Sequence, residues 1–247
     1  MWATVTSEIR KIYTVRSTYG VLALVLVMLC IFAFYADGLR GAAGAENPEL
    51  LMSEARNAIT ATAVLASLIG ALLVTNEYRY NTINYTVTLT KRRLQVLLAK
   101  ILVVSIFAVV FAVLISVLSP LLAYAGLSIK GVHLVGQTVF FKDMLWQLPF
   151  VCWGYSMLAL LFAVVVRNQV GTLALILLFE GTVESLLTLA LKEDAVYLPY
   201  KVLNAVMNGA ASGTHISAAA NAMLFLGYML CAWLIAAFLF VRRDASN

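Results

Sequence analysis

Residues 76–100 read NEYRYNTINYTVTLTKRRLQVLLAK and form the longest polar, basic interruption in this apolar chain. The stretch holds five Lys and Arg residues and a single acid, Glu77, and long apolar runs flank it on both sides. A polar segment between two membrane-spanning runs is a loop at one membrane face, and an excess of Lys and Arg is typical of the cytoplasmic face. The pattern predicts that residues 76–100 form a cytoplasmic loop through which a soluble partner contacts a membrane domain.

The composition of the 247-residue chain supports a membrane protein. Hydrophobic residues make up 63% of it, the mean hydropathy is +0.94, and 12% of residues are charged. A soluble domain usually carries about twice that charged share. The formal net charge is +5, but the cations flank apolar runs and form no exposed stripe, which argues against nucleic-acid binding. We therefore expect a single all-α integral membrane domain over residues 1–247.

Six apolar runs are each near or above the length of about 17 residues that a helix needs to cross the hydrocarbon layer. They lack the alternation of a β-barrel, so helices are the structure that satisfies their backbone in lipid. Pro120 is expected to kink or end the third helix. The outer segment 192–217 is partly apolar, which fits either a surface loop or a short helix dipping into the membrane. The expected spans are residues 19–36, 58–74, 101–125, 148–166, 170–191 and 218–241.

The first 18 residues predict an amphipathic helix in the headgroup region, because apolar residues recur there at helical spacing. These apolar residues are Trp2, Val5, Ile9, Ile12 and Tyr13. With the N-terminus inside, 11 cations lie on the cytoplasmic side and 6 on the outer side. The excess predicts that both termini of a multi-pass protein of the cell membrane are cytoplasmic.

Motifs for catalysis and metal binding are absent from the sequence. There is no G-x-x-x-x-G-K-[ST] phosphate loop, no H-E-x-x-H, no G-x-S-x-G and no cluster of Cys and His. The three cysteines each fall inside an apolar run, where they are expected to act as small packing residues. We expect no catalytic residue, no metal site and no cofactor in this chain.

Three stretches carry a resemblance to a known family. They are SEIRKIYTVRSTYGVL (7–22), EYRYNTINYTVTLTKRRLQVLLAK (77–100) and ALLFAVVVRNQVGTLALILLFEGTVESLL (159–187). Together they resemble the permease subunit of ABC-2-type transporters, the six-helix class of type V exporters whose ATPase is a separate chain. The residues that match the family pattern are Glu77, Thr82, Leu89, Arg92 or Arg93, and Lys100. Asn81 replaces a glycine of that pattern, and no proline follows Leu89.

The resemblance implies two permease copies, identical or homologous, and two copies of a separate ABC ATPase subunit that binds ATP and Mg²⁺. It also implies a short coupling helix within residues 78–94, although residues 83–90 alternate with a strand-like period of two. A loop that only anchors the topology through its charges is the remaining alternative. The residues expected to contact the ATPase are Glu77, Tyr78, Arg79, Thr82, Ile83, Tyr85, Val87, Leu89, Arg92 and Arg93.

Glu180 and Glu184 are the acids inside an expected span, four residues apart and so on one helix face. An ionised acid inside the bilayer is costly, so these two should face a neighbouring helix, a dimer interface or a wet cavity. They would then line a substrate path or make hydrogen bonds within the bundle. The sequence thus predicts the permease of an ABC exporter for a hydrophobic or amphipathic substrate such as a drug, an antimicrobial peptide or a lipid, in contact with membrane lipid. The alternatives are an ion-coupled transporter that uses these acids and a membrane immunity or anchor protein.

Overall fold

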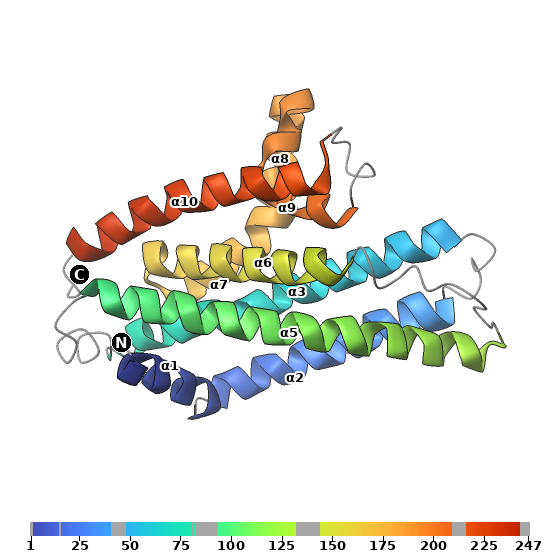
Figure 1. The fold of residues 1–247 in the computed structure, drawn as a ribbon, viewed down its shortest axis with the longest axis horizontal. Coiled ribbons are helices and arrows are strands. Elements are labelled where there is room, and N and C mark those ends of the chain that lie inside the picture. Colours follow the sequence, from blue (N-terminus) through green and yellow to red (C-terminus); the bar gives the residue numbers. More distant parts are fainter. Residues whose placement is uncertain are drawn as a thin grey trace.

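A computed structural model describes residues 2–14, 16–40, 48–80, 82, 93–131, 144–208 and 216–242. All the regular elements in these ranges are helices, which confirms the all-α prediction (Figure 1). The elements are α1 (Trp2–Thr14), α2 (Arg16–Cys30), η1 (Ile31–Arg40), α3 (Pro48–Arg79), α5 (Arg93–Ile129), α6 (Met144–Val166), α7 (Gln169–Leu178), η4 (Phe179–Val183), α8 (Glu184–Leu191), η5 (Lys192–Tyr197), α9 (Pro199–Asn208) and α10 (Ala218–Arg242).

Five helices within the described residues are long and apolar enough to cross a membrane, and a sixth span results if the bent pair around η4 counts as one. The five are α3, α5, α6, α10 and the span formed by α2 with η1. In the sixth, α7 and the helical segment Gly181–Tyr197 meet at an angle of 41°. Of the two effects expected of Pro120, a kink or an end of the third helix, the end is wrong, because α5 continues to Ile129. A proline removes one backbone hydrogen bond, which so long a helix tolerates.

The spanning helices α2, α3, α5, α6 and α10 run along the long axis of the molecule, and α1 lies across one end of them (Figure 1). The beginning of α1, the end of α3, the beginning of α5, the α6–α7 turn and the end of α10 all lie at this end. We call it the termini end.

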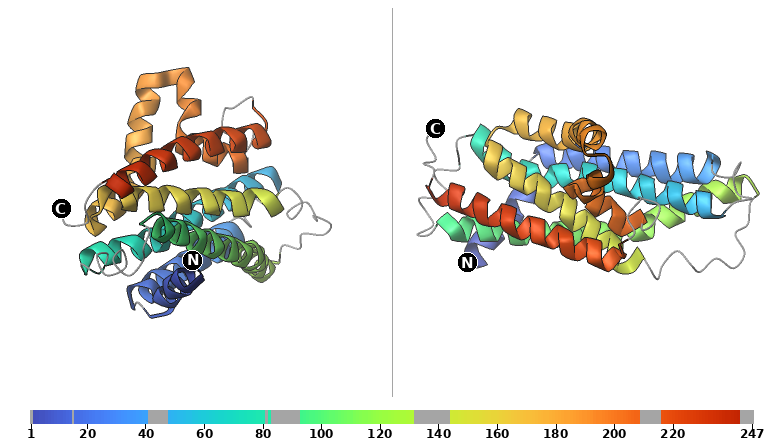
Figure 2. Two further views of the ribbon diagram at one scale, coloured as in Figure 1. Left: turned by 60° about the vertical axis from the view of Figure 1, so that its left-hand side comes forward. Right: turned by 90° about the horizontal axis from the view of Figure 1, so that it is seen from above.

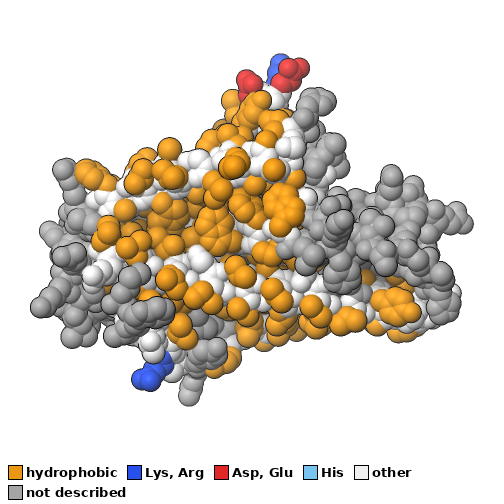
Figure 3. Space-filling view, viewed as in Figure 1, with side chains coloured by type: hydrophobic (Ala, Val, Ile, Leu, Met, Phe, Trp, Pro, Cys, Tyr) orange, Lys and Arg blue, Asp and Glu red, His pale blue; other side chains and the backbone are white. Residues whose placement is uncertain are grey.

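Helix α3 is the central helix of the bundle. Within its span, 83% of residues 60–79 are buried, against 22% for the spans of α2 and α10. Small residues allow this close packing: a Cβ at Gly70 would lie 3.0 Å from Cγ1 of Val104 in α5. The outer helices instead expose apolar side chains, which are spread over the described part of the face shown in Figure 3. Such a surface suits contact with lipid.

Elements α7 to α9 form a hairpin that rises from the side of the bundle (Figures 1 and 2). Its returning helix, α9, buries Val202, Leu203 and Val206 and packs against α6 and α10. Tyr155 of α6 donates a hydrogen bond of 2.9 Å to Oδ1 of Asn204. Part of the segment 192–217 is therefore a helix buried in protein, and residues 209–215 lie outside the described ranges.

Candidate functional site

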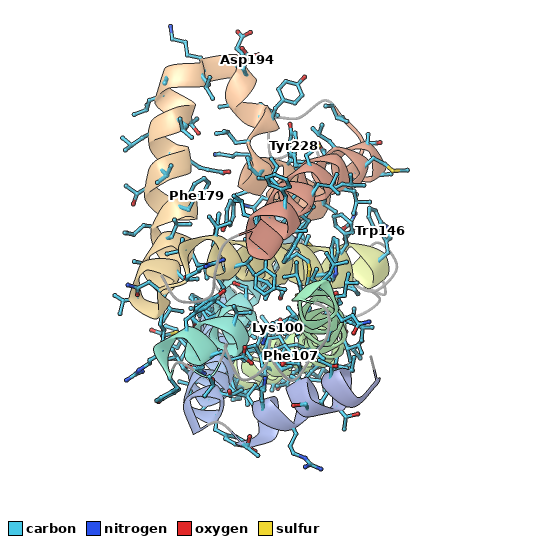
Figure 4. All side chains as sticks on the ribbon, turned by 90° about the vertical axis from the view of Figure 1, so that its left-hand side faces the viewer. Lys100, Phe107, Trp146, Phe179, Asp194 and Tyr228 are labelled. Atoms are coloured by element: carbon cyan, nitrogen blue, oxygen red, sulfur yellow. The ribbon has the colours of Figure 1, made fainter. Side chains whose placement is uncertain are left out.

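Four charged side chains meet at the termini end and tie three helices together. Glu8 and Lys11 come from α1, Glu77 from the last turn of α3, and Lys100 from α5. Nζ of Lys100 lies 2.9 Å from Oε2 of Glu8 and 2.9 Å from Oε1 of Glu77. Nζ of Lys11 lies 2.6 Å from Oε1 of Glu8 and also pairs with Oε1 of Glu77. We call these four residues the ion cluster, and Figure 4 shows Lys100 inside the bundle as seen from the termini end.

Three of the four members of the ion cluster are buried, Lys11 is partly exposed, and the cluster is electrically balanced. Glu8, Lys100 and Glu77 expose 1%, 2% and 4% of their surfaces, and two carboxylates face two ammonium groups. Burial of the Lys11 ammonium group lowers its pKa, but the charges and hydrogen bonds of Glu77 and Glu8 outweigh that effect, so the pKa of Lys11 is raised above its ordinary value. Removal of one partner from such a group leaves an uncompensated buried charge, which is strongly destabilising.

The position of Glu8 follows from the packing of α1. Val5 and Glu8 lie one helical turn apart on the side of α1 that faces the bundle, and both are buried. Ile9, which the amphipathic pattern places with the apolar residues, is 36% exposed. The prediction of a helix near the N-terminus is confirmed. The buried side of this helix carries an acid, Glu8, which is paired with Lys100 of α5.

A cavity lies beside the ion cluster, between the end of α3 and the α6–α7 turn. It measures about 550 Å³ and is lined by Tyr78, Arg79, Arg167, Asn168, Gln169, Val170 and Leu173. The side chain of Asn168 caps α7 by accepting from the amides of Val170 and Gly171, at 3.0 and 3.4 Å. We call this cavity the arginine pocket.

The comparison with known families bears on both features. The sequence model of the ABC-2 family transporter proteins matches residues 5–183, well over half of the chain, including the ion cluster and the arginine pocket. The chain belongs to this family. The resemblance drawn from the sequence is thereby confirmed: the protein is a multi-pass membrane permease subunit of an ABC transporter, and the family works with an ATPase subunit. The chain matches none of the curated proteins with which it was compared.

The structure distributes the permease's predicted ATPase contacts over different environments. Glu77 is buried in the ion cluster, Tyr78 and Arg79 line the arginine pocket, and Thr82 is exposed, with its amide donating to the carbonyl of Glu77 at 2.9 Å. Arg93 is the first residue of α5, and its side chain is outside the described part of the chain. The remaining predicted contacts, which include most of the expected coupling helix, also lie outside the described residues; they are Ile83, Tyr85, Val87, Leu89 and Arg92.

Of the two acids of the fifth span, Glu184 is the one whose side chain the structure describes. Glu184 is 2% exposed and accepts a hydrogen bond of 2.8 Å from the amide of Tyr200, at the beginning of α9. Glu180 lies in η4, a five-residue π-helix. Its side chain is not among those described. Glu184 thus makes a hydrogen bond within the bundle, one of the two roles expected of it, and its partner is the returning helix of the hairpin.

Sequence reasoning missed Glu8, Lys11 and Arg167 as members of these sites. Arg167 lies in the turn between α6 and α7, where its backbone φ of 57° is left-handed, which is uncommon for a residue other than glycine. Its guanidinium carbon lies 5.8 Å from the ring centre of Tyr78. The one available signal was the spacing of Glu8 and Lys11, three residues apart and able to pair on one helix face.

Proposed function

We propose that this permease is the membrane half of an ATP-driven exporter and that two copies of a separate ABC ATPase dock on the loop between α3 and α5. The observation that carries this proposal is the ion cluster. It joins the two helices that flank the loop to each other and to α1. A force applied to the loop by the ATPase, as it binds ATP and Mg²⁺, would then move three helices as one unit.

The charge distribution supports a cytoplasmic position for the termini end in the cell membrane. Arg10, Lys11, Arg79, Lys100 and Arg167 all lie at this end. Cations are enriched in the short cytoplasmic segments of membrane proteins. The ATPase would therefore approach from the side on which both termini lie.

The hairpin supports a second copy of the permease, identical or homologous, as a partner. Its tip carries the exposed Lys192, Glu193 and Asp194, and it stands off the side of the bundle (Figures 1 and 4). Charged groups at the side of a membrane bundle avoid lipid and face protein or water. A second copy beside the hairpin would provide that environment and would enclose a path between the two protomers.

A hydrophobic or amphipathic substrate suits the apolar surfaces of the bundle. The alternative function, an ion-coupled transporter in which Glu180 and Glu184 carry ions, gains no support. The carboxylate of Glu184, which the structure describes, accepts a hydrogen bond from a backbone amide. The rival of a non-transporting membrane anchor or immunity protein predicts that no ATPase binds.

Co-purification and transport test the proposal directly. The permease should co-purify with a separate P-loop ATPase subunit, and vesicles reconstituted with both should accumulate an amphipathic dye when ATP is supplied. Replacement of Ile83, Tyr85 and Val87 by Asp should uncouple ATP hydrolysis from transport, because an apolar contact would bury unpaired charges. A matched control replaces residues 128–130, exposed at the opposite end of α5, by Asp and should leave coupling unchanged. Normal transport by the first variant would refute the docking assignment.

A further inference from the structure

Helix α8 adds few side chains to the core of its own protomer. Within this helix Glu184 is buried and Thr188 is partly buried, and every other residue is exposed. The exposed fraction is 62% for Leu186 and 77% for Leu189. The helix packs chiefly on η4 and η5, its neighbours along the chain. Most of this apolar helix is therefore left for contact with something outside the protomer.

The exposed leucines of α8 lie on the side of the helix that is turned away from α9. Glu184 accepts a hydrogen bond from the amide of Tyr200 in α9, so the Glu184 side of α8 faces α9. Successive residues of a helix lie about 100° apart, which places Leu186, Leu189 and Ala190 on the opposite side. All three are exposed, and we call them the leucine face. An apolar face that includes a small residue allows a second helix to approach closely.

Charges of both signs follow the leucine face directly in the chain. Lys192, Glu193 and Asp194 are exposed, and among the residues that the structure describes they take part in no ion pair. Figure 3 shows basic and acidic side chains together at the top of the hairpin. We call these three residues the charged tip. The leucine face and the charged tip together form a patch with an apolar part and an ionic part.

The charged tip lies beside the membrane-spanning part of the bundle. Tyr197, three residues after Asp194, accepts at its carbonyl a hydrogen bond of 3.0 Å from the hydroxyl of Tyr228. Tyr228 lies near the middle of the 23-residue span of α10. The hairpin leaves the bundle sideways, and its tip lies beside α10 and not beyond either end of it (Figures 1 and 2). Charged groups in such a place face protein or water, so lipid alone does not account for the patch.

We propose that the leucine face and the charged tip form the contact between two identical copies of this permease, related by a two-fold axis beside α8. The inference rests on the proposed function, in which two copies work together, and adds the contact surface and the identity of the copies. Under two-fold symmetry a patch meets itself, so Lys192 of one copy would face the acids of the other tip. The two leucine faces would pack on each other, and such close packing drives helix association in lipid.

Self-association of two differently tagged copies tests the charged tip. The assay measures how much of a FLAG-tagged permease a His-tagged permease retains in a mild detergent. K192E makes the whole tip acidic and E193K/D194K makes it basic, so each variant alone should retain at least about tenfold less through like-charge repulsion. A mixture of the two variants should retain nearly as much as the wild type, because opposite tips then meet. K130E, a charge reversal at an exposed lysine just after α5, should behave like the wild type.

Leucine variants test the apolar part of the contact in the same assay. L186A/L189A should lower the retained amount about tenfold, because truncation of central anchor residues removes much of the binding energy of an interface. The matched control is L230A/L234A, which shortens two leucines of α10 that are 64% and 65% exposed. These lie outside the proposed contact, so the control should retain as much as the wild type.

Other results would overturn the proposal. A wild type that does not self-associate would leave the patch to lipid, water or a different protein. Tip variants that each self-associate like the wild type, or a mixture that retains no more than either variant alone, would show that the tips do not meet. If a tip variant does not fold, L186A/L189A decides, and its unchanged self-association would exclude the contact.

Retention of the ATPase subunit by the same samples separates this proposal from the proposed function. K192E should still retain the ATPase, because the loop between α3 and α5 is unchanged. A wild type that retains the ATPase without self-association would overturn the contact and leave the docking proposal standing. Self-association that depends on the tip, in a permease that retains no ATPase, would support the contact and overturn the docking.

Discussion

Replacement of Lys100 by Met tests whether the ion cluster holds the termini end together. The ammonium group contacts Glu8 and Glu77 at 2.9 Å each and is 2% exposed, so water cannot replace it without opening the bundle. The substitution leaves two buried carboxylates against one ammonium group. Breaking a buried ion pair in this way costs about 3–5 kcal/mol, which is about 10² to 10⁴ in the folding equilibrium.

Thermal unfolding of the detergent-purified permease measures this loss. For a chain of this length each kcal/mol corresponds to about 2–4 °C, so K100M should lower Tm by about 6–20 °C. The double variant E77Q/K100M removes one charge of each sign and leaves Glu8 paired with Lys11 at 2.6 Å. Because its cluster is neutral again, it should recover much of the lost stability.

The control is K130M, which removes an exposed lysine at the opposite end of α5 and should change Tm by less than about 2 °C. Two results would refute the reasoning. K100M as stable as the wild type would show that the buried cluster contributes nothing to folding. E77Q/K100M no more stable than K100M would show that charge balance is not the cause.

Three further predictions follow from buried contacts. Glu184→Gln should keep the hydrogen bond to the beginning of α9 and the wild-type Tm, whereas Glu184→Leu should cost about 1–3 kcal/mol, because it leaves a buried amide unsatisfied. Gly154→Ala should lower Tm, because its Cβ would lie 2.6 Å from Cδ1 of the buried Leu203, whereas Gly227→Ala, with nothing within 4 Å, should not. Because the folded pKa of Lys11 is raised above 10.5, its contribution to stability is complete below that pH and is lost as the pH rises through the folded value. The Tm difference between wild type and Lys11→Met should therefore be constant from about pH 7 to 9 and shrink above about pH 10.5.

The spans and the family were predictable from the sequence because they depend on length and composition. A run of about 20 apolar residues can do little else than cross the bilayer, so the helices follow from hydropathy. Glu77 and Lys100 were identified through their match to the family pattern, and the structure places both in the ion cluster. Glu8 could not be found that way. A charge on an amphipathic helix is expected to face water, and its partner stands 92 residues further along the chain.

The geometry around Glu184 was unpredictable for a different reason. The sequence predicts one continuous α-helix of 3.6 residues per turn throughout the span. Residues 179–183 adopt a π-helix, and the span bends there by 41°. The apolar pattern of the sequence does not indicate a π-helical turn, because the residues around positions 179–183 are compatible with an α-helix and with a π-helix alike. The hydrogen bond to Tyr200 depends on α9 folding back, which hydropathy does not encode.

The last turn of α3 connects the two features of the termini end. Successive helical residues point about 100° apart, so Glu77 faces α1 and α5 while Tyr78 and Arg79 face the α6–α7 turn. The amide of Thr82, at the start of the loop, donates to the carbonyl of Glu77. A displacement of the loop would therefore reach the ion cluster through Glu77 and the arginine pocket through its two neighbours. The first side is closed by balanced charges, and the arginine pocket lies on the second. If the ATPase docks on the loop as proposed, both features would receive the displacement through the same turn of α3.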